Sequence, residues 1–393
     1  KECAIGKYPV ETVNMLSNLI SQFNFVNEGG EESIIEKIGS KNYLYNENLP
    51  EILVKPHGGR LVNRFIPNYE GPIPEMKVEI DEDTLMDAEQ IAIGAFSPVE
   101  GFMKKSEFDS VAESMRLPSG VGWTLPVILQ VSEGTAQSLK NKEDISLTYK
   151  GEIHAILHLE EIYAINKEEY AIKIFGTIDP SHPGVKKFLD SGEYFLGGKI
   201  TLLKRKSSNH KVHELTPAQT RKIFSERGWS KVLGFHTRNV IHRSHEFIQM
   251  EGMERCLCDG LFVHPIIGHK KNGDFESEII IKTYEKMIEE FYPKSRVVLG
   301  AFASYSRYYG PREAVFTALV RKNFGCSHFI VGRDHTGVGS FYSPDASHRI
   351  FDNFTEEELG IRPVRFGNVF YSDLEGRHIH ESDFIEHPEE SKI

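Results

Sequence analysis

Residues 232–245 read VLGFHTRNVIHRSH, an apolar run that passes into a polar segment with two arginines, one asparagine and three histidines. The apolar run is typical of a buried strand, and a helix is expected from about Ile241. His242 and His245 stand three positions apart, so a helix would place both on one face of its first turn. Where a strand ends and a helix begins, free backbone N–H groups and the helix dipole attract anions. Arg238 adds a rigid fork of donors for an oxyanion, so this stretch predicts an anion site.

The same alternation of strand and helix continues along the chain. A helix should start at Thr216, because this hydroxyl residue is followed by proline and, three residues on, by Gln219. Apolar runs then alternate with helical stretches, at residues 232–235, 261–264, 278–290, 297–301, 311–323 and 327–331. This spacing indicates βαβ units and a parallel sheet. Ligands bind such sheets outside the carboxyl ends of the strands, so the loops after Phe235, His264, Ala301 and Val331 are the candidate site.

The first half of the chain has a different pattern. Short runs broken by Gly, Asp and Asn predict strands at residues 123–131, 145–149, 153–159, 170–175 and 194–203. A β-rich domain is therefore expected over residues 51–205, followed by an α/β domain over 206–352. The acidic tail, residues 353–393, has strand-like pieces near 363–371 and predicts a small C-terminal subdomain. Residues 1–50 form a separate N-terminal segment.

Composition narrows the class of protein. The chain has 393 residues, a formal net charge of −11 and four cysteines. The negative charge opposes binding to nucleic acid, and scattered cysteines favour a reducing compartment. No run approaches the roughly 18 apolar residues of a membrane span. These features predict a cytoplasmic enzyme with no nucleic-acid or membrane partner.

A second loop, residues 332–340, reads GRDHTGVGS directly after an apolar run. Three glycines allow close approach of the backbone to a ligand, while Arg333 and His335 supply positive charge. A glycine-rich turn alone is more often only a turn. Its position after a predicted core strand favours nucleotide binding.

At this point the sequence resembles the ATP sulfurylases. Residues 236–245 are similar to that family's Gln-Thr-Arg-Asn-Pro-x-His-x-x-His motif, and residues 332–337 to its Gly-Arg-Asp-His-Ala-Gly motif. Further matches are GAFSPVEGFM at 94–103, VHPIIG at 263–268 and YGPREA at 309–314. The resemblance implies a PUA-like β-rich N-terminal domain, a Rossmann-like (HUP-type) nucleotidyltransferase α/β domain and a small C-terminal subdomain.

The resemblance also implies an activity and its site. The reaction would join sulfate to the α-phosphate of ATP, giving adenylyl sulfate and diphosphate, with Mg²⁺ arriving on ATP. Thr237, Arg238 and Asn239 would be catalytic. Sulfate would be held by His236, Arg238 and the backbone of Thr336. The ATP site would comprise the residues of both loops and one position near adenine: His236, Thr237, Arg238, Asn239, His242, His245, Gly332, Arg333, Asp334, His335 and Val369.

Three positions depart from the family pattern. His236 stands in place of glutamine, Val240 in place of proline and Thr336 in place of alanine. An imidazole donates one hydrogen bond when neutral and two when charged. A neighbouring sulfate should favour the charged form, which predicts a raised pKa for His236. The catalytic trio is intact, so activity is expected.

Some members of the family carry a zinc site near the C-terminal end. Here residues 371–373 read YSD where the first cysteine would stand, and Cys256 and Cys258 are too close together for the usual spacing. No structural zinc is therefore expected. Residues 4–13 resemble a short stretch of pyruvate kinase, and a homo-oligomer, a dimer or larger, is expected.

Two other functions remain open. One is adenylyl transfer to a different acceptor, such as a phosphorylated small molecule. The other is a catalytically silent nucleotide or anion sensor, which the changes at His236 and Val240 favour modestly. The sequence leaves open whether the reaction runs towards sulfate assimilation or towards ATP formation.

Overall fold

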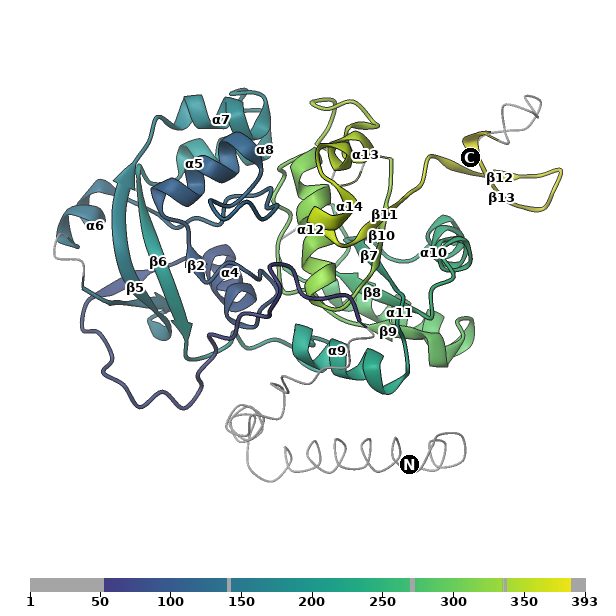
Figure 1. Ribbon diagram of the computed structural model, residues 1–393, viewed down its shortest axis with the longest axis horizontal. Helices are drawn as coiled ribbons and strands as arrows, with labels where there is room; N and C mark the ends of the chain where they lie inside the picture. Colours follow the sequence, from purple (N-terminus) through teal and green to yellow (C-terminus); the bar gives the residue numbers. More distant parts are fainter. Residues whose placement is uncertain (1–52, 140–142, 269–272, 334, 336–337, 383–393) are drawn as a thin grey trace.

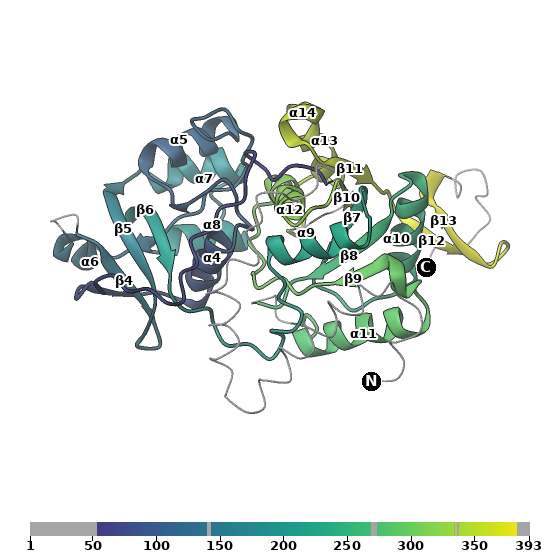
Figure 2. The same ribbon diagram turned by 60° about the horizontal axis from the view of Figure 1, so that its bottom comes forward.

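The computed structural model describes residues 53–139, 143–268, 273–333, 335 and 338–382. These residues form two domains that lie side by side (Figures 1 and 2). The predicted pyruvate-kinase-like segment lies outside the described residues.

A mostly antiparallel sheet forms the centre of the N-terminal domain. Its strands run in the order β1-β4-β5-β6-β2, and β3 pairs with β6. The bounds are β1 (Lys77–Glu79), β2 (Gly101–Phe102), β3 (Gln130–Val131), β4 (Ile145–Tyr149), β5 (Glu152–Ala164) and β6 (Tyr194–Leu202). Lys150 and Gly151 join β4 to β5, both with the positive φ that a two-residue hairpin turn favours.

Helices complete this domain. They are α4 (Glu82–Ala92), α5 (Lys105–Ser114), α6 (Glu133–Ser138), α7 (Lys167–Phe175) and α8 (Pro183–Asp190). Phe108 of α5 packs its ring against Tyr163 of β5 and Phe195 of β6, so apolar burial fixes this helix on the sheet.

Two of the strands predicted for this domain are wrong. Residues 170–175 belong to α7, because Asn166 caps the helix, Gly176 ends it in a left-handed conformation, and the buried residues follow a helical spacing. Within 123–131 only Gln130–Val131 forms a strand. Pro126 has no N–H to give to a sheet.

The C-terminal domain is built on a five-stranded parallel sheet, as predicted. The strands are β7 (Val232–Thr237), β8 (Gly260–Pro265), β9 (Val297–Leu299), β10 (His328–Val331) and β11 (Arg362–Arg365), in the order β11-β10-β7-β8-β9. The chain runs outward from β7 to β9, then returns to the other side of β7 as β10 and β11. The strand order therefore reverses between β7 and β10, the point at which such sheets bind ligands.

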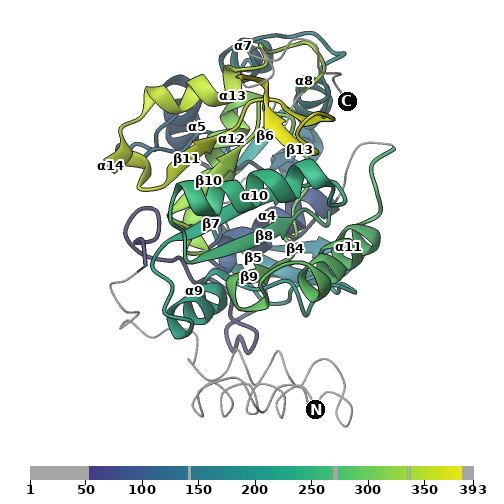
Figure 3. The same cartoon turned by 90° about the vertical axis from the view of Figure 1, so that its right-hand side faces the viewer.

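Helices cover both faces of this sheet. They are α9 (Pro217–Glu226), α10 (Arg243–Arg255), α11 (Ser277–Glu290), η1 (Lys294–Arg296), α12 (Pro311–Asn323), α13 (Ala346–Arg349), η2 (Ile350–Asn353) and α14 (Glu356–Leu359). In Figure 3, α10 and α11 lie in front of the strands. Leu233 and Phe235 of β7 pack on this side, whereas Val232 packs with α9 and α12 on the other. The predicted helix start at Thr216 is confirmed, with its capping box.

The tail of the chain divides between the sheet and a hairpin. β11 pairs with β10 in parallel and forms the edge of the sheet. β12 (Val369–Ser372) and β13 (Arg377–His380) then form a two-stranded hairpin. His380 of this hairpin forms an ion pair with Glu251 of α10 at 2.7 Å, which fixes the hairpin beside that helix (Figure 1).

Helix α12 joins the two domains. The Asn323 side chain donates to the carbonyls of Ala95 and Ser97, at 2.9 Å each. Just before the helix, Arg307 forms a buried ion pair with Asp87 of α4. These polar contacts, together with a shared apolar core, hold the N-terminal domain against the helix that flanks the switch point.

Candidate functional site

A cleft opens at the carboxyl ends of β7 and β10, where the strand order reverses. Its volume is about 200 Å³. It is lined by residues from both predicted loops and from the segment before α12: Phe235, His236, Thr237, Arg238, Asn239, His245, Ile248, Ile266, Ser306, Tyr308, Glu313, Ile330, Gly332 and His335. The structure thus brings together residues that lie about 100 positions apart in the sequence, as topology predicts.

Thr237 ends β7 and shapes the turn that follows. Its hydroxyl accepts a hydrogen bond from the backbone N–H of Asn239 at 3.0 Å. Thr237 is buried, whereas Asn239 is exposed at the mouth of the cleft. The turn between them projects Arg238 into the cleft, so the predicted trio lies together.

Arg238 has a carboxylate beside it. Its Nε lies 3.5 Å from Oδ2 of Asp274, in the segment before α11. Sequence reasoning did not single out Asp274. At this distance the contact is an ion pair rather than a hydrogen bond with good geometry.

His236 is held by a buried arginine on the neighbouring helix. Nη2 of Arg321 donates to Nδ1 of His236 at 2.6 Å. Burial, and then the charge of Arg321, lower the pKa of His236 well below its ordinary value. The raised pKa predicted from the sequence refers to His236 beside bound sulfate and stays a prediction. In the protein alone, a lone pair that already accepts from a cation disfavours a proton.

The two histidines of the helix start lie against each other. Helix α10 begins at Arg243, two residues after the predicted start, and His242 is its N-cap residue. The rings of His242 and His245 stack with centroids 3.7 Å apart. Burial lowers the pKa of His245 to about 3 and also lowers that of His242. Both rings are therefore neutral at pH 7 and offer N–H donors rather than charge.

The second loop contributes Gly332 and His335 to the cleft. A Cβ placed on Gly332 would meet no atom of the described residues within 4 Å, so space is open beside this glycine in that part of the chain. His335 Nε2 lies 3.0 Å from the Thr317 hydroxyl of α12, and burial lowers the pKa of His335 to about 3. Predicted residues Asp334 and Thr336 lie outside the described residues.

Three predicted site residues are not among the described residues that line the cleft: His242, Arg333 and Val369. His242 stacks on the cleft residue His245. Arg333 is exposed next to Gly332 in the second loop, and Val369 lies on β12.

One wall of the cleft comes from the loop after Ala301 and the start of α12. The sequence predicted this loop as part of the site, but its residues were not singled out. Glu313 in the first turn of α12 accepts from the backbone N–H of Tyr309 at 3.0 Å, and burial raises its pKa. Tyr308 lies beside it with a positive φ of 60°, a strained conformation for a non-glycine residue that is frequent at functional sites. Residues 309–314 had been noted only as a family match, and their place after β9 was the signal.

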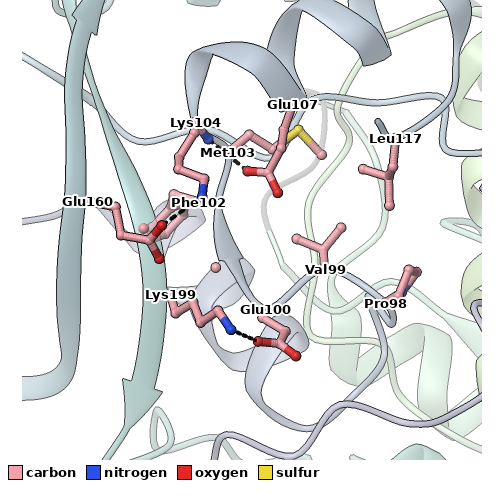
Figure 4. A pocket seen from close by; sticks show the side chains of 12 residues that line it. Pro98, Val99, Glu100, Phe102, Met103, Lys104, Glu107, Leu117, Glu160 and Lys199 are labelled. Atoms are coloured by element: carbon pink, nitrogen blue, oxygen red, sulfur yellow. Dashed lines mark hydrogen bonds and ion pairs between the residues drawn. The ribbon is translucent and has the colours of Figure 1, made fainter. Parts of the chain in front are cut away.

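A second hollow, of about 250 Å³, lies in the N-terminal domain (Figure 4). Lys104 pairs with Glu160 and Lys199 with Glu100, each at 2.7 Å. Because both cations already face carboxylates, this hollow is a poorer site for a polyanion than the cleft at the switch point.

The described residues place limits on metal and membrane sites. No group of three or more His, Cys, Asp or Glu side chains within them is arranged to hold a metal ion. No helix in the same part of the chain combines the length and the apolar character that crossing a membrane requires.

Comparisons with known proteins agree with this architecture. Residues 211–393 match the ATP-sulfurylase family model, and residues 54–205 match the PUA-like domain. A sulfate adenylyltransferase from Synechococcus sp. (strain JA-3-3Ab) is 44% identical over 331 residues, which cover 82% of this chain and 84% of the relative. The sulfate adenylyltransferase of Staphylothermus marinus is 43% identical over 352 residues, covering 87% and 90%.

The fold is also that of a solved structure. The chain is similar to the hexameric APS kinase from Thiobacillus denitrificans with a TM-score of 0.64, at 21% identity, over 84% of this chain and 60% of that chain. The parallel sheet, the cleft at its switch point and the matches over most of both lengths lead to one conclusion: the chain belongs to the ATP-sulfurylase family.

Proposed function

We propose that this protein is a sulfate adenylyltransferase, which converts ATP and sulfate to adenylyl sulfate and diphosphate. The observation that carries the proposal is the cleft at the switch point, which is lined by Arg238 from one loop and by Gly332 from the other. A cationic fork and a glycine that admits close approach of a ligand suit two anions that must meet. Relatives that bear the name sulfate adenylyltransferase support this choice.

The chemistry requires positioning and charge neutralisation. A sulfate oxygen attacks the α-phosphorus in line, a bond forms between them, and the bond from that phosphorus to the diphosphate oxygen breaks. Both partners are anions, so we assign Arg238 and His236 to sulfate, and Thr237 and Asn239 to the α-phosphate. Donors fixed before the reaction stabilise charge without reorganisation.

We place the nucleotide along the second loop. Open space at Gly332 lets a phosphate approach the backbone closely. His245 would offer a neutral N–H donor to the phosphates from the first turn of α10. The family resemblance adds His242, Arg333, Asp334 and His335 at the nucleotide, the Thr336 backbone at sulfate and Val369 near adenine. Mg²⁺ enters as the complex with ATP, bound chiefly by phosphate oxygens.

One experiment tests the proposal. Purified protein is given ATP and Mg²⁺ with inorganic sulfate, with a phosphorylated small molecule or with neither, and diphosphate release is measured. Release that requires sulfate supports the proposal. Release only with a phosphorylated small molecule indicates a different adenylyl acceptor. Nucleotide binding with no release under either condition indicates a silent sensor.

We further propose a cytoplasmic homo-oligomer without structural zinc. The spacing of Cys256 and Cys258, which is too close for the usual zinc-binding pair, supports the proposal about zinc. Elemental analysis of the purified protein and light scattering on a sizing column test the two points. One zinc per chain, or a monomer at micromolar concentration, would contradict them.

A further inference from the structure

The burial of Arg321 cannot be explained by a gain in stability alone. This arginine lies on α12 and is fully buried. Nη2 donates to the carbonyl of His264 at 3.0 Å as well as to His236. Within the described residues no carboxylate pairs with it, and its Nε and Nη1 lack hydrogen-bond partners. An uncompensated buried cation is costly, so a function is the natural reason to keep it.

The bond to His236 fixes the state of that ring. A guanidinium only donates, so Nδ1 of His236 must accept and therefore carries no proton. In a neutral imidazole the proton then belongs to Nε2, on the other side of the ring. His236 lines the cleft, so Nε2 is the atom that can donate into it.

Burial is the largest cause that keeps the His236 ring neutral, and the charge of Arg321 on α12 is the next. Arg238 after β7 adds further positive charge near the ring, while His335 after β10 and His264 of β8 also face it. A neutral donor remains available over the whole range in which an ordinary histidine titrates.

We infer that Arg321 is a positioning residue, which holds His236 as the Nε2–H tautomer so that its ring donates to a sulfate oxygen. This inference rests on the proposed function of the cleft. It also explains how histidine can replace glutamine, because a glutamine amide offers the same pair, an acceptor oxygen and a donor nitrogen. Without Arg321 the tautomers would mix, and part of the population would turn a lone pair towards the anion.

The tautomer is tested first, without activity. The full chain is labelled with ¹⁵N-histidine, and the His236 signals are assigned by difference from His236→Gln. The expected spectrum is that of an Nε2–H ring that does not change between pH 6 and 8. In Arg321→Met both nitrogens should move towards the averaged positions of mixed tautomers. An Nδ1–H ring, or a ring that titrates in this range, overturns the inference even where the Met variant fails to fold.

The role in sulfate binding is tested by kinetics. Arg321→Met should raise KM for sulfate by between about two-fold, where half of the population presents the donor, and about ten-fold, where the hydrogen bond to the anion is lost throughout. KM for ATP should stay unchanged. In a His236→Leu background the same change should have no further effect on KM for sulfate. An unchanged KM, or an equal effect in both backgrounds, overturns the inference.

Arg221 provides the matched control. It is also a buried arginine, but it donates to the carbonyls of Val54, Lys322 and Asn323, away from the cleft. Arg221→Met should lower stability and leave KM for sulfate unchanged; a rise equal to that of Arg321→Met counts against a specific role. Absence of sulfate-dependent diphosphate release by the unmodified protein would instead remove the proposed function, and the spectrum would still report the tautomer.

Discussion

Nε of Arg238 lies 3.5 Å from Oδ2 of Asp274, so the proposed sulfate-binding cation has a carboxylate of the same chain beside it. An anion that enters the cleft competes with this carboxylate for the guanidinium. The two residues therefore have opposite expected effects on sulfate binding.

Arg238→Ala should lower kcat/KM for sulfate by about 10²-fold or more, because it removes the charge placed against the reacting anions. The far-ultraviolet circular dichroism and the melting temperature should stay close to those of the unmodified protein, since the side chain is partly exposed. Near-normal turnover would remove Arg238 from the site.

Asp274→Asn should lower KM for sulfate by about two- to five-fold, the scale of a partly exposed ion pair. The substitution keeps the shape of the side chain and removes the competing charge. Initial rates at several sulfate concentrations measure the effect. A higher KM would mean that Asp274 orients Arg238 rather than competing for it.

Gly332→Ala should weaken ATP binding and leave the stability of the protein nearly unchanged. The added Cβ would meet no atom within 4 Å among the residues that the structure describes, so the free energy of unfolding should change by no more than about 0.5 kcal/mol. KM for ATP should rise, because the methyl group enters the space proposed for a phosphate. Gly339→Ala is the control: its φ of 55° is left-handed, so it should cost about 1 kcal/mol of stability.

Asp87→Asn should destabilise the protein by about 3–5 kcal/mol, because it leaves Arg307 buried without its counter-charge. Asp190→Asn, which breaks the exposed pair with Lys186, should cost less than about 0.5 kcal/mol. Urea unfolding at pH 7 compares the two. Equal small losses would show that the interface does not depend on this ion pair.

His57 should make the protein sensitive to mild acid. Burial, and next the charge of Lys322, lower its pKa from 6.5 to about 4. The unfolded chain then binds the proton more readily, so stability is lost as pH falls from about 6.5 towards 4. At pH 5 this histidine should account for about 2 kcal/mol. His57→Gln should lose less stability than the unmodified protein between pH 7 and 5, and identical losses would exclude His57 as the cause.

The parallel sheet was predictable because both of its faces are covered. Strands such as β8 and β10 are buried along their whole length, so they read as apolar runs. Helix α7 was missed because its short apolar run at 170–175 fits a strand as well as a helix turn. β11 was placed in the tail subdomain because Pro363 and the charged residues around it gave no sign that it is an edge strand.

The loop residues of the site were predictable from the sequence, but the residues that hold them in position were not. Thr237, Arg238 and Gly332 belong to motifs at the carboxyl ends of strands, which is where parallel sheets bind ligands. The partner of His236 is Arg321, which is 85 positions away in the sequence on α12. Residues 318–322 are all apolar or charged, so they give no sign of this contact. The neutral state of His236 follows from its burial and from that contact, so no local pattern could reveal it.

Helix α12 has a consequence for how this protein could be recombined with its relatives. Its Glu313 lines the cleft, and its Thr317 and Arg321 bind cleft histidines. On the other side, its Arg312 and Asn323 bind carbonyls of the N-terminal domain. A chimera cut at the domain boundary near residue 205 would unite this helix with an unfamiliar N-terminal surface. The unit to exchange is therefore the N-terminal domain together with the surface of α12 that contacts it. A chimera that keeps a mismatched α12 would displace the residues of this helix that contact the cleft.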